Sequence, residues 1–220
     1  KKGSYQVFDI KSDYVDMILK KIDIKRNLKV AIDSGNAAGC ILTPSLYKKF
    51  NLDVYELYCE IDGTFPNHHP DPTVDNNLKD LQNFVIDNEC DVGMAFDGDA
   101  DRIVVIDEKG RIVRSDILIS IFIPYVIKPG DSVVFDVKCS KALEDVVLSN
   151  KGHPVMWKTG HSLIKDKMKE TKSKLGGEMS GHIFFADHYY GYDDAIYVSL
   201  RLAQLLSNQS TTLSNLISHI

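Results

Sequence analysis

The order in which short apolar segments alternate with amphipathic segments restricts the fold of this sequence most. Five β-branched segments have the length of strands, at residues 28–33, 52–59, 91–97, 132–137 and 153–158. Segments with apolar residues at helical spacing follow most of them, at residues 43–50, 74–88, 141–150 and 162–170. Strands separated by helices in this order are typical of mostly parallel sheets covered by helices. The sequence therefore predicts an α/β fold.

The pattern begins again halfway along the chain, which predicts two units. A first helix is expected within residues 4–22, and a hairpin within residues 102–113 closes the first half. Apolar helices are expected near residues 117–127 and 194–206 of the second half. We predict two consecutive three-layer α/β/α domains with mostly parallel mixed sheets, at residues 1–114 and 115–220. The halves share an order of elements without a clear sequence repeat.

Charge and composition exclude several classes of protein. The formal net charge of -5 over 220 residues favours neither nucleic acid nor an anionic membrane as a partner. No apolar run approaches the ~20 residues that span a bilayer. The four cysteines are far apart without a C-x-x-C pair, which argues against structural zinc and predicts a reducing, cytoplasmic location. No signal peptide is evident, and both ends look cut, so we expect a part of a longer protein.

The loops that follow the predicted strands are the expected functional edge, because open α/β sheets bind ligands beyond the carboxyl ends of their strands. The most informative of them is "AFDGDADR", in which Asp97, Asp99 and Asp101 alternate with small residues. Carboxylates this close repel one another unless a cation lies between them, and oxygen ligands favour Mg²⁺, with Ca²⁺ or Mn²⁺ as alternatives. An EF-hand is disfavoured because its glycine and its final glutamate are missing. The plain alternative is a solvated acidic turn.

Arg102 follows the three aspartates. Its guanidinium suits bidentate binding of a phosphate beside the ion, although it could simply pair with one of the aspartates.

A second loop, "GEMSGH", holds a carboxylate, a hydroxyl and an imidazole between glycines. Glu178 and Ser180 could accept from and donate to neighbouring hydroxyls of a sugar, and His182 could carry a proton. The alternative is an ordinary loop with a half-buried histidine.

Lys138, in "DVKCS", and His161, in "WKTGHSL", also follow predicted strands and could bind an anion at a helix N-terminus. Taken alone, such residues are more often solvated. Lys165 and the other lysines of the following helix are expected on a solvated face and receive no role. For His68 and His69 we prefer a rigid proline-bounded loop over a ligand site.

Together these motifs resemble the α-D-phosphohexomutases, the phosphomannomutase/phosphoglucomutase group. "DGDADR" is similar to the family's metal loop, usually DGDGDR, with Ala100 in place of the second glycine. "GEMSGH" resembles its sugar-recognition loop. "DGTFPNHHPDP", "FDVKCS", "WKTGHSLIK" and "GYDDAIY" also match, in the same order, across roughly residues 5–207.

The resemblance implies an isomerase in which a phosphoserine passes its phosphoryl group to a hexose phosphate. The sugar 1,6-bisphosphate then reorients and returns the other group, which interconverts hexose 1-phosphate and 6-phosphate. Asp97, Asp99 and Asp101 would hold Mg²⁺. Glu178 and Ser180 would bind the sugar 3- and 4-hydroxyls, with Lys138 and His161 as further substrate contacts. His182 and Arg102 would be catalytic.

Two parts of the family pattern are missing from this chain. The phosphoserine loop of the first domain and the phosphate-clamp loop of the fourth domain have no counterpart. The chain thus resembles the second and third domains, and we expect it to be inactive alone. Two alternatives stay open: a stand-alone module that binds sugar phosphate or metal, and a phosphatase with Asp97 as nucleophile.

Overall fold

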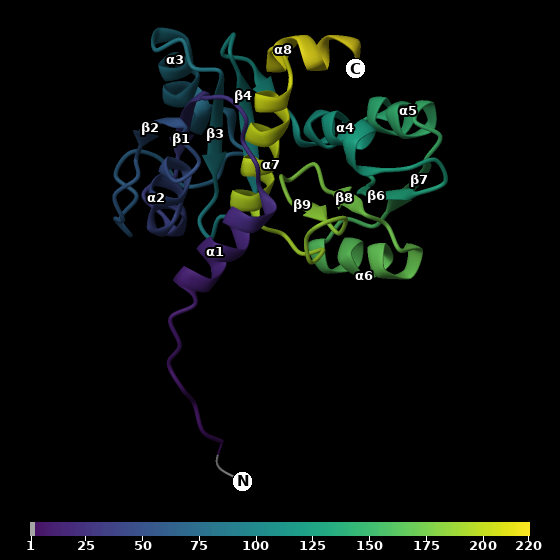
Figure 1. Cartoon of the computed structure of the whole chain (residues 1–220), viewed down its shortest axis with the longest axis horizontal. Coiled ribbons are helices and arrows are strands. Elements are labelled where there is room, and N and C mark those ends of the chain that lie inside the picture. Colours follow the sequence, from purple (N-terminus) through teal and green to yellow (C-terminus); the bar gives the residue numbers. More distant parts are fainter. Residues whose placement is uncertain (1–2) are drawn as a thin grey trace.

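Two mixed β-sheets lie side by side in a computed structural model that describes residues 3–220 (Figure 1). The strands of the first sheet are β1 (Lys29–Asp33), β2 (Asp53–Leu57), β3 (Val92–Phe96), β4 (Ile103–Asp107) and β5 (Ile112–Val113). Those of the second are β6 (Ser132–Asp136), β7 (His153–Trp157), β8 (Leu175–Gly177) and β9 (Ile183–Phe185).

The two sheets share one arrangement of strands. The order is β2-β1-β3-β4-β5 in the first and β7-β6-β8-β9 in the second. In each sheet the second strand in this order, β1 or β6, pairs in parallel with both neighbours. The strand beyond these three, β4 or β9, is antiparallel to β3 or β8. This confirms the predicted α/β class with mixed sheets. The hairpin expected near Glu108–Gly110 joins β4 to β5.

Helices connect and cover these strands. They are α1 (Lys11–Lys21), α2 (Thr43–Lys48), α3 (Lys79–Asp87), α4 (Ser115–Val126), α5 (Lys141–Ser149), α6 (His161–Thr171), α7 (Ala195–Asn208) and α8 (Leu213–Leu216). Short 3-10 turns occupy Ala38–Ile41, Asp75–Leu78 and Ile217–His219. Within residues 3–220, none of these helices has both the length and the apolar character that a membrane crossing needs.

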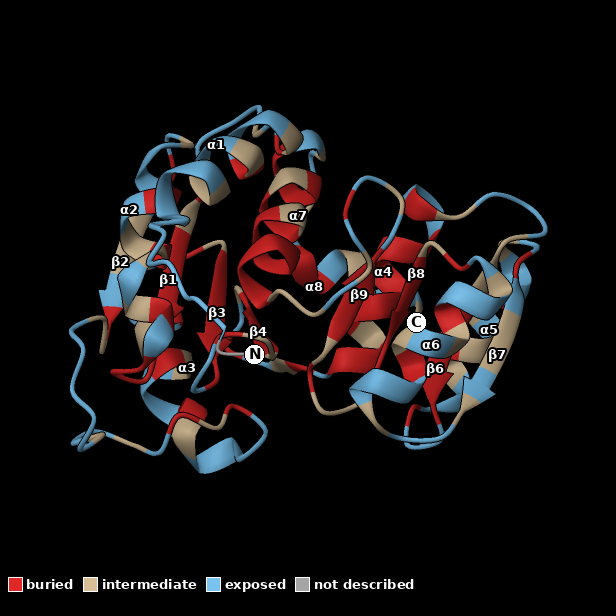
Figure 2. Ribbon diagram, turned by 90° about the horizontal axis from the view of Figure 1, so that it is seen from below, coloured by how far each residue is buried: buried red, intermediate tan, exposed pale blue. Residues whose placement is uncertain are grey.

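Each sheet is packed on both faces, which gives three layers. In the first unit, Leu81 and Val85 of α3 bury one face together with Ala31 and Ile106. In the second unit, Ile164 and Met168 of α6 cover one face, and α4 and α5 cover the other. The central strands are buried over nearly their whole length, as expected for sheets covered on both sides (Figure 2).

Helix α7 lies between the two units, alongside α1 and β4 (Figure 1). The hydroxyl of Ser199 contacts that of Tyr47 in α2, so α7 helps to cover the first sheet. On its other side, the guanidinium of Arg201 stacks over the ring of Phe185 in β9. A single apolar core therefore runs from the first sheet through α7 into the second.

The first helix is shorter than the sequence suggested. It was expected within residues 4–22 but begins at Lys11, and residues 3–10 have no regular structure. Tyr5, Val7 and Phe8 remain exposed there. A short helix in water gains most of its stability from packing an apolar face, and these exposed side chains bury no such face against residues 11–220.

We predict that the shared core makes the two units unfold together. Leu200→Ala in α7 should lower the free energy of unfolding by about 2–5 kcal/mol, because Leu200 is fully buried and a cavity would remain. Leu148→Ala, on an exposed face of α5, is the matched control and should change it little. Urea unfolding followed by Trp157 fluorescence and by far-UV circular dichroism should give coincident transitions. Separate transitions would show independent units.

Candidate active site at the junction of the two sheets

The "DGDADR" loop leaves the carboxyl end of β3 as a tight turn. The N–H of Ala100 donates to the carbonyl of Asp97 over 3.2 Å, which folds the loop back on itself. Ala100 has φ +62°, in the left-handed region where a glycine is less strained. In the phosphohexomutases that this loop resembles, a glycine usually occupies this position. A glycine would adopt this φ without the backbone strain that Ala100 has.

The three aspartates of the loop meet the geometric requirement for one cation. Their carboxylate oxygens can all lie within 4.8 Å of one another. Asp97 is buried, Asp101 is half-buried and Asp99 is exposed. An ion held by all three carboxylates would therefore lie at the surface of the protein. Burial raises the pKa of Asp97, outweighing the hydrogen bonds from Arg102. A divalent cation would favour its charged form, so these residues fit Mg²⁺.

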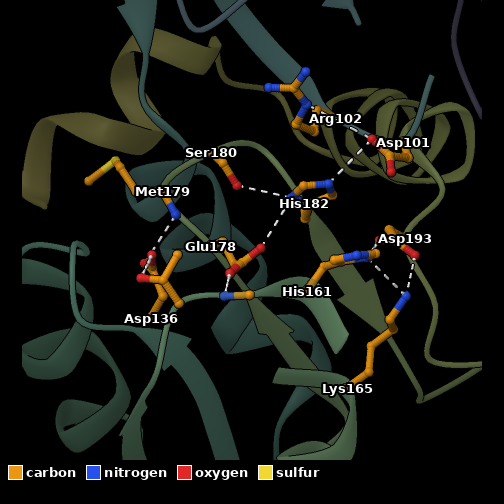
Figure 3. Close-up of polar contacts among 12 residues, drawn as sticks. Asp101, Arg102, Asp136, His161, Lys165, Glu178, Met179, Ser180, His182 and Asp193 are labelled. Atoms are coloured by element: carbon orange, nitrogen blue, oxygen red, sulfur yellow. Dashed lines mark hydrogen bonds and ion pairs between the residues drawn. The ribbon is translucent and has the colours of Figure 1, made fainter. Parts of the chain in front are cut away.

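Arg102 is held by the metal loop itself. Its Nε donates to Oδ2 of Asp97 over 2.6 Å, and its Nη1 lies 3.5 Å from Oδ1 of Asp71. The guanidinium extends away from His182, and no hydrogen bond within residues 3–220 uses its Nη2 (Figure 3). Part of the fork thus remains available for another anion.

A main-chain contact joins the metal loop to "GEMSGH", which turns from β8 into β9. The N–H of Ile103 donates to the carbonyl of Gly181 over 3.2 Å, and Arg102 and His182 form an isolated antiparallel bridge. Gly181 has φ +109°, and a Cβ there would lie 2.9 Å from the carbonyl oxygen of Ile103. Only glycine fits this crossing without strain.

His182 lies between carboxylates of both units (Figure 3). Its Nε2 is 3.3 Å from Oδ1 of Asp101, and its Nδ1 is 3.1 Å from Oε2 of Glu178 and 2.9 Å from Oγ of Ser180. Burial lowers the pKa of His182, but the hydrogen bonds to Asp101 and Glu178 outweigh it and raise the pKa to about 9. The ring is therefore an imidazolium at neutral pH and holds a proton between the two loops.

The two carboxylates respond to this cation. The hydrogen bond from His182 lowers the pKa of Asp101. Burial acts to raise the pKa of Glu178, yet His182 and the N–H of Gly160 lower it overall. Glu178 is only 2% exposed, and its two carboxylate oxygens contact His182 and the N–H of Gly160. It therefore orients His182, and a ligand could use only the lone pairs that these two contacts leave free.

His161 begins α6 and stacks on His182 with 5.3 Å between ring centroids. Its Nδ1 is 2.8 Å from Oδ2 of Asp193, whose other oxygen accepts from Nζ of Lys165 over 2.8 Å. Lys165 is half-buried, so the expectation of a solvated side chain was wrong for this residue. Burial raises the pKa of Asp193, but the donors Lys165 and His161 together lower it.

Two buried aspartates at equivalent strand ends brace the site. Asp136, the last residue of β6, accepts from the N–H of Met179 and from the hydroxyl of Thr159. Asp33, the last residue of β1, accepts from the N–H of Gly35 and lies 2.9 Å from Nε2 of His68. The His68 pairing agrees with the preferred interpretation of a rigid loop at residues 60–72.

All nine residues that the sequence suggested lie around this junction. Lys138 reaches it from the loop after β6 and lines one cavity together with Arg102 and Ser180. Sequence reasoning gave no role to Asp193, Lys165, Asp136 or Asp33. Asp193 lies within the quoted motif "GYDDAIY", which was a usable signal. The two other aspartates fall inside predicted strands, and their equivalent positions become visible only when the strands are aligned.

Comparisons with known proteins match the chain over nearly its whole length. A family model described as "Phosphoglucomutase/phosphomannomutase, alpha/beta/alpha domain II" matches residues 12–110, and the corresponding domain III model matches residues 114–220. A phosphomannomutase/phosphoglucomutase of Pseudomonas aeruginosa is 46% identical over 93% of this chain and 45% of the relative. A phosphoglucomutase of Neisseria meningitidis is 43% identical over 98% of this chain and 48% of the relative.

A solved structure agrees with these matches. A phosphoglucomutase/phosphomannomutase family protein from Burkholderia thailandensis superposes with a TM-score of 0.94 at 41% identity, covering 97% of this chain and 47% of that one. The chain spans about half the length of the curated relatives it matches.

We predict that the Gly181 crossing controls stability. Gly181→Ala should lower the free energy of unfolding by about 1–3 kcal/mol, because the new methyl group meets a backbone oxygen at positive φ. Gly63→Ala, whose Cβ would meet nothing within 4 Å, is the control. Equal effects of both substitutions in urea unfolding would contradict a tight crossing.

The His68–Asp33 pair predicts a pH dependence. The hydrogen bond to Asp33 raises the pKa of His68 in the folded protein. The pair should therefore stabilise the fold fully below the unfolded pKa of about 6.5, and less as pH rises through the folded value. The stability difference between the wild-type protein and His68→Gln, measured by urea unfolding, should shrink from pH 6 upward. In an Asp33→Asn background this trend should disappear, and a trend that persists there would contradict the assignment.

Proposed function

The chain belongs to the phosphoglucomutase/phosphomannomutase family, of which it carries the second and third α/β/α domains. On this premise we propose that it is the central portion of an enzyme that interconverts hexose 1-phosphate and 6-phosphate. The observation that carries the proposal is the position of His182. Its ring lies between Asp101 of the "DGDADR" loop and Glu178 of the "GEMSGH" loop, which supports one site shared by the two loops.

The metal loop would hold the family's Mg²⁺ through Asp97, Asp99 and Asp101. When bound, such an ion would neutralise negative charge on the transferred phosphoryl group. Arg102 adds a fixed positive charge beside the loop, and its remaining N–H groups can bind a phosphate oxygen.

The sugar loop supplies proton chemistry and hydroxyl recognition. His182 carries a proton at neutral pH and would give it to a sugar oxygen, which leaves the neutral ring to take a proton back in the reverse step. Glu178 and Ser180 would bind the 3- and 4-hydroxyls, and Lys138 and His161 would reach further hydroxyl or phosphate oxygens. Asp193 keeps His161 in place during this binding.

The reacting partners of this site are expected elsewhere. By family resemblance, the phosphoserine lies in a first domain and the phosphate clamp in a fourth domain. The substrates would be glucose or mannose phosphates and their 1,6-bisphosphates, in the cytoplasm. In-line transfer needs nucleophile, metal and clamp together, so residues 1–220 should show no mutase activity.

A chimera tests this function. Residues 12–220 would replace the matching segment of the Pseudomonas aeruginosa relative, and conversion of glucose 1-phosphate to glucose 6-phosphate would be measured with Mg²⁺. We expect turnover by the chimera and none by residues 1–220 alone. Asp99→Asn should lower kcat by about 10²-fold or more, in line with the loss of one preorganised charge. Asp166→Asn, exposed on α6, is the matched control.

Other outcomes would favour the two alternatives. Turnover by residues 1–220 alone would overturn the proposal. Hydrolysis of a generic phosphate ester with Mg²⁺, lost in Asp97→Asn, would indicate a phosphatase. An inactive chimera, combined with tight binding of hexose phosphate by residues 1–220, would indicate a binding module.

A further inference from the structure

Two of the four cysteines follow neighbouring strands of the first sheet. Cys40 belongs to the 3-10 turn Ala38–Ile41 after β1, and Cys59 comes shortly after β2. Strands β1 and β2 pair in parallel, so the segments after them leave the sheet at the same edge. Both side chains are half-buried, whereas the other two cysteines, Cys90 and Cys139, are buried. The sheet topology therefore brings the two more accessible thiols to one place.

The backbone of Tyr58 joins the two segments. Tyr58 has φ +52°, and its carbonyl accepts from the N–H of Asn36 over 2.7 Å. A residue other than glycine keeps this conformation only where its surroundings hold it there. The Cys40 thiol donates to the same carbonyl, with 3.5 Å between Sγ and the oxygen. Since Tyr58 directly precedes Cys59, the sulfur of Cys40 lies against the backbone beside Cys59.

The hydroxyl of Ser34 lies near both thiols. Sγ of Cys59 is 3.5 Å from Oγ of Ser34. Burial raises the pKa of Cys40, and the Ser34 hydroxyl acts to lower it. Burial also raises the pKa of Cys59 to about 11, while Ser34 acts to lower it and Cys40 adds to the rise. Such effects act over short distances, so they agree with two neighbouring sulfur atoms.

A cavity of about 340 Å³ gives small molecules access to Cys59. Its lining is polar and includes two acidic residues; the lining residues are Asn36, Glu56, Tyr58, Cys59, Glu60 and Asn67. The acidic side chains repel an anionic reagent, whereas a neutral one can enter.

We propose that Cys40 and Cys59 are a redox modification site, at which a small neutral disulfide converts the two thiols into an intramolecular disulfide bond. The thiolate of Cys59 attacks one sulfur of the reagent, which forms a mixed disulfide and releases one small thiol. The thiolate of Cys40 then attacks Sγ of Cys59 and expels the second small thiol. The protein loses two electrons and two protons, and the reagent takes up both as it becomes two thiols.

This reaction is expected to be slow, although its equilibrium can still favour the bond. Both thiols are mostly protonated at neutral pH, and the thiolate is the attacking form. The equilibrium depends instead on how well the fold holds the two sulfur atoms at bonding geometry. Equilibrium is therefore the quantity to measure.

The disulfide would act on the metal loop through the 3-10 turn. The N–H of Ala38, two residues before Cys40, donates to the carbonyl of Gly98 over 3.2 Å. Strand β1 lies between β2 and β3 (Figure 1). A bond to Cys59 draws the turn toward the end of β2 and away from the loop after β3. Oxidation should thus weaken the contact between Ala38 and Gly98.

Equilibration of residues 1–220 with 2-mercaptoethanol and its neutral disulfide tests the site. Free thiols would be trapped with N-ethylmaleimide, and linked peptides would be identified by mass spectrometry. We expect one bond, between Cys40 and Cys59. It should form at least about tenfold more readily in the native protein than in urea, because the fold holds the two thiols together.

Three variants check the assignment of the bond. Cys40→Ala and Cys59→Ala should each abolish it, and both should still fold because these side chains are half-buried. Cys90→Ala, which removes a buried thiol of the same unit, is the matched control and should keep the bond. Bonds to other cysteines, or a Cys40–Cys59 bond that forms no more readily in the native protein than in urea, would refute the site.

Two measurements test the link to the metal loop. Amide hydrogen exchange of Ala38 should become faster on oxidation of residues 1–220, and unchanged exchange would refute the link. Turnover of the chimera should fall on oxidation and return with dithiothreitol, and Cys40→Ala should remove this response; this step rests on the function proposed above. A chimera that is inactive even when reduced, with the bond formed in residues 1–220, would count against the proposed function and support the site.

Discussion

The backbone crossing between Ile103 and Gly181 is the contact on which the rest of the site depends. It brings the turn after β3 and the turn after β8 within hydrogen-bonding distance, and the two turns come from different sheets. His182 and Glu178 belong to the same turn, so it is the pairing of His182 with Asp101 that needs the crossing. The crossing therefore joins two separate strand-end loops, and the half-buried His182 then lies between a carboxylate of each loop.

The acidic residues of the site divide into two kinds. Asp33 and Asp136 occupy equivalent ends of the central strands, are almost fully buried, and bind backbone or side-chain donors of neighbouring loops. Asp99 and Asp101 keep solvent access and can exchange ligands. The inner acids hold the loops, and the outer acids are the ones that the proposed function assigns to the metal, so the proposed site would stand on a rigid base.

Much of this could be predicted from the sequence because strand, turn and helix signals were local. The α/β class, the hairpin at Glu108–Gly110 and the strand-end position of Asp97 all follow from neighbouring residues. Lys165 shows the limit: its helix looked like a solvated face, but Asp193, 28 positions away, pairs with it. The start of α1 and the place of α7 were equally beyond local reasoning, because packing against distant segments decides both.

The position of α7 bears on how the chain acquires its structure during synthesis. The first sheet is complete in sequence at Val113, yet part of its apolar cover arrives only with Ala195–Asn208. The ribosome synthesises about 80 residues between Val113 and Ala195, at roughly 5–20 residues per second. Apolar surface of the nascent first sheet therefore remains exposed for several seconds. Chaperone dependence and aggregation should therefore depend on how quickly translation reaches α7.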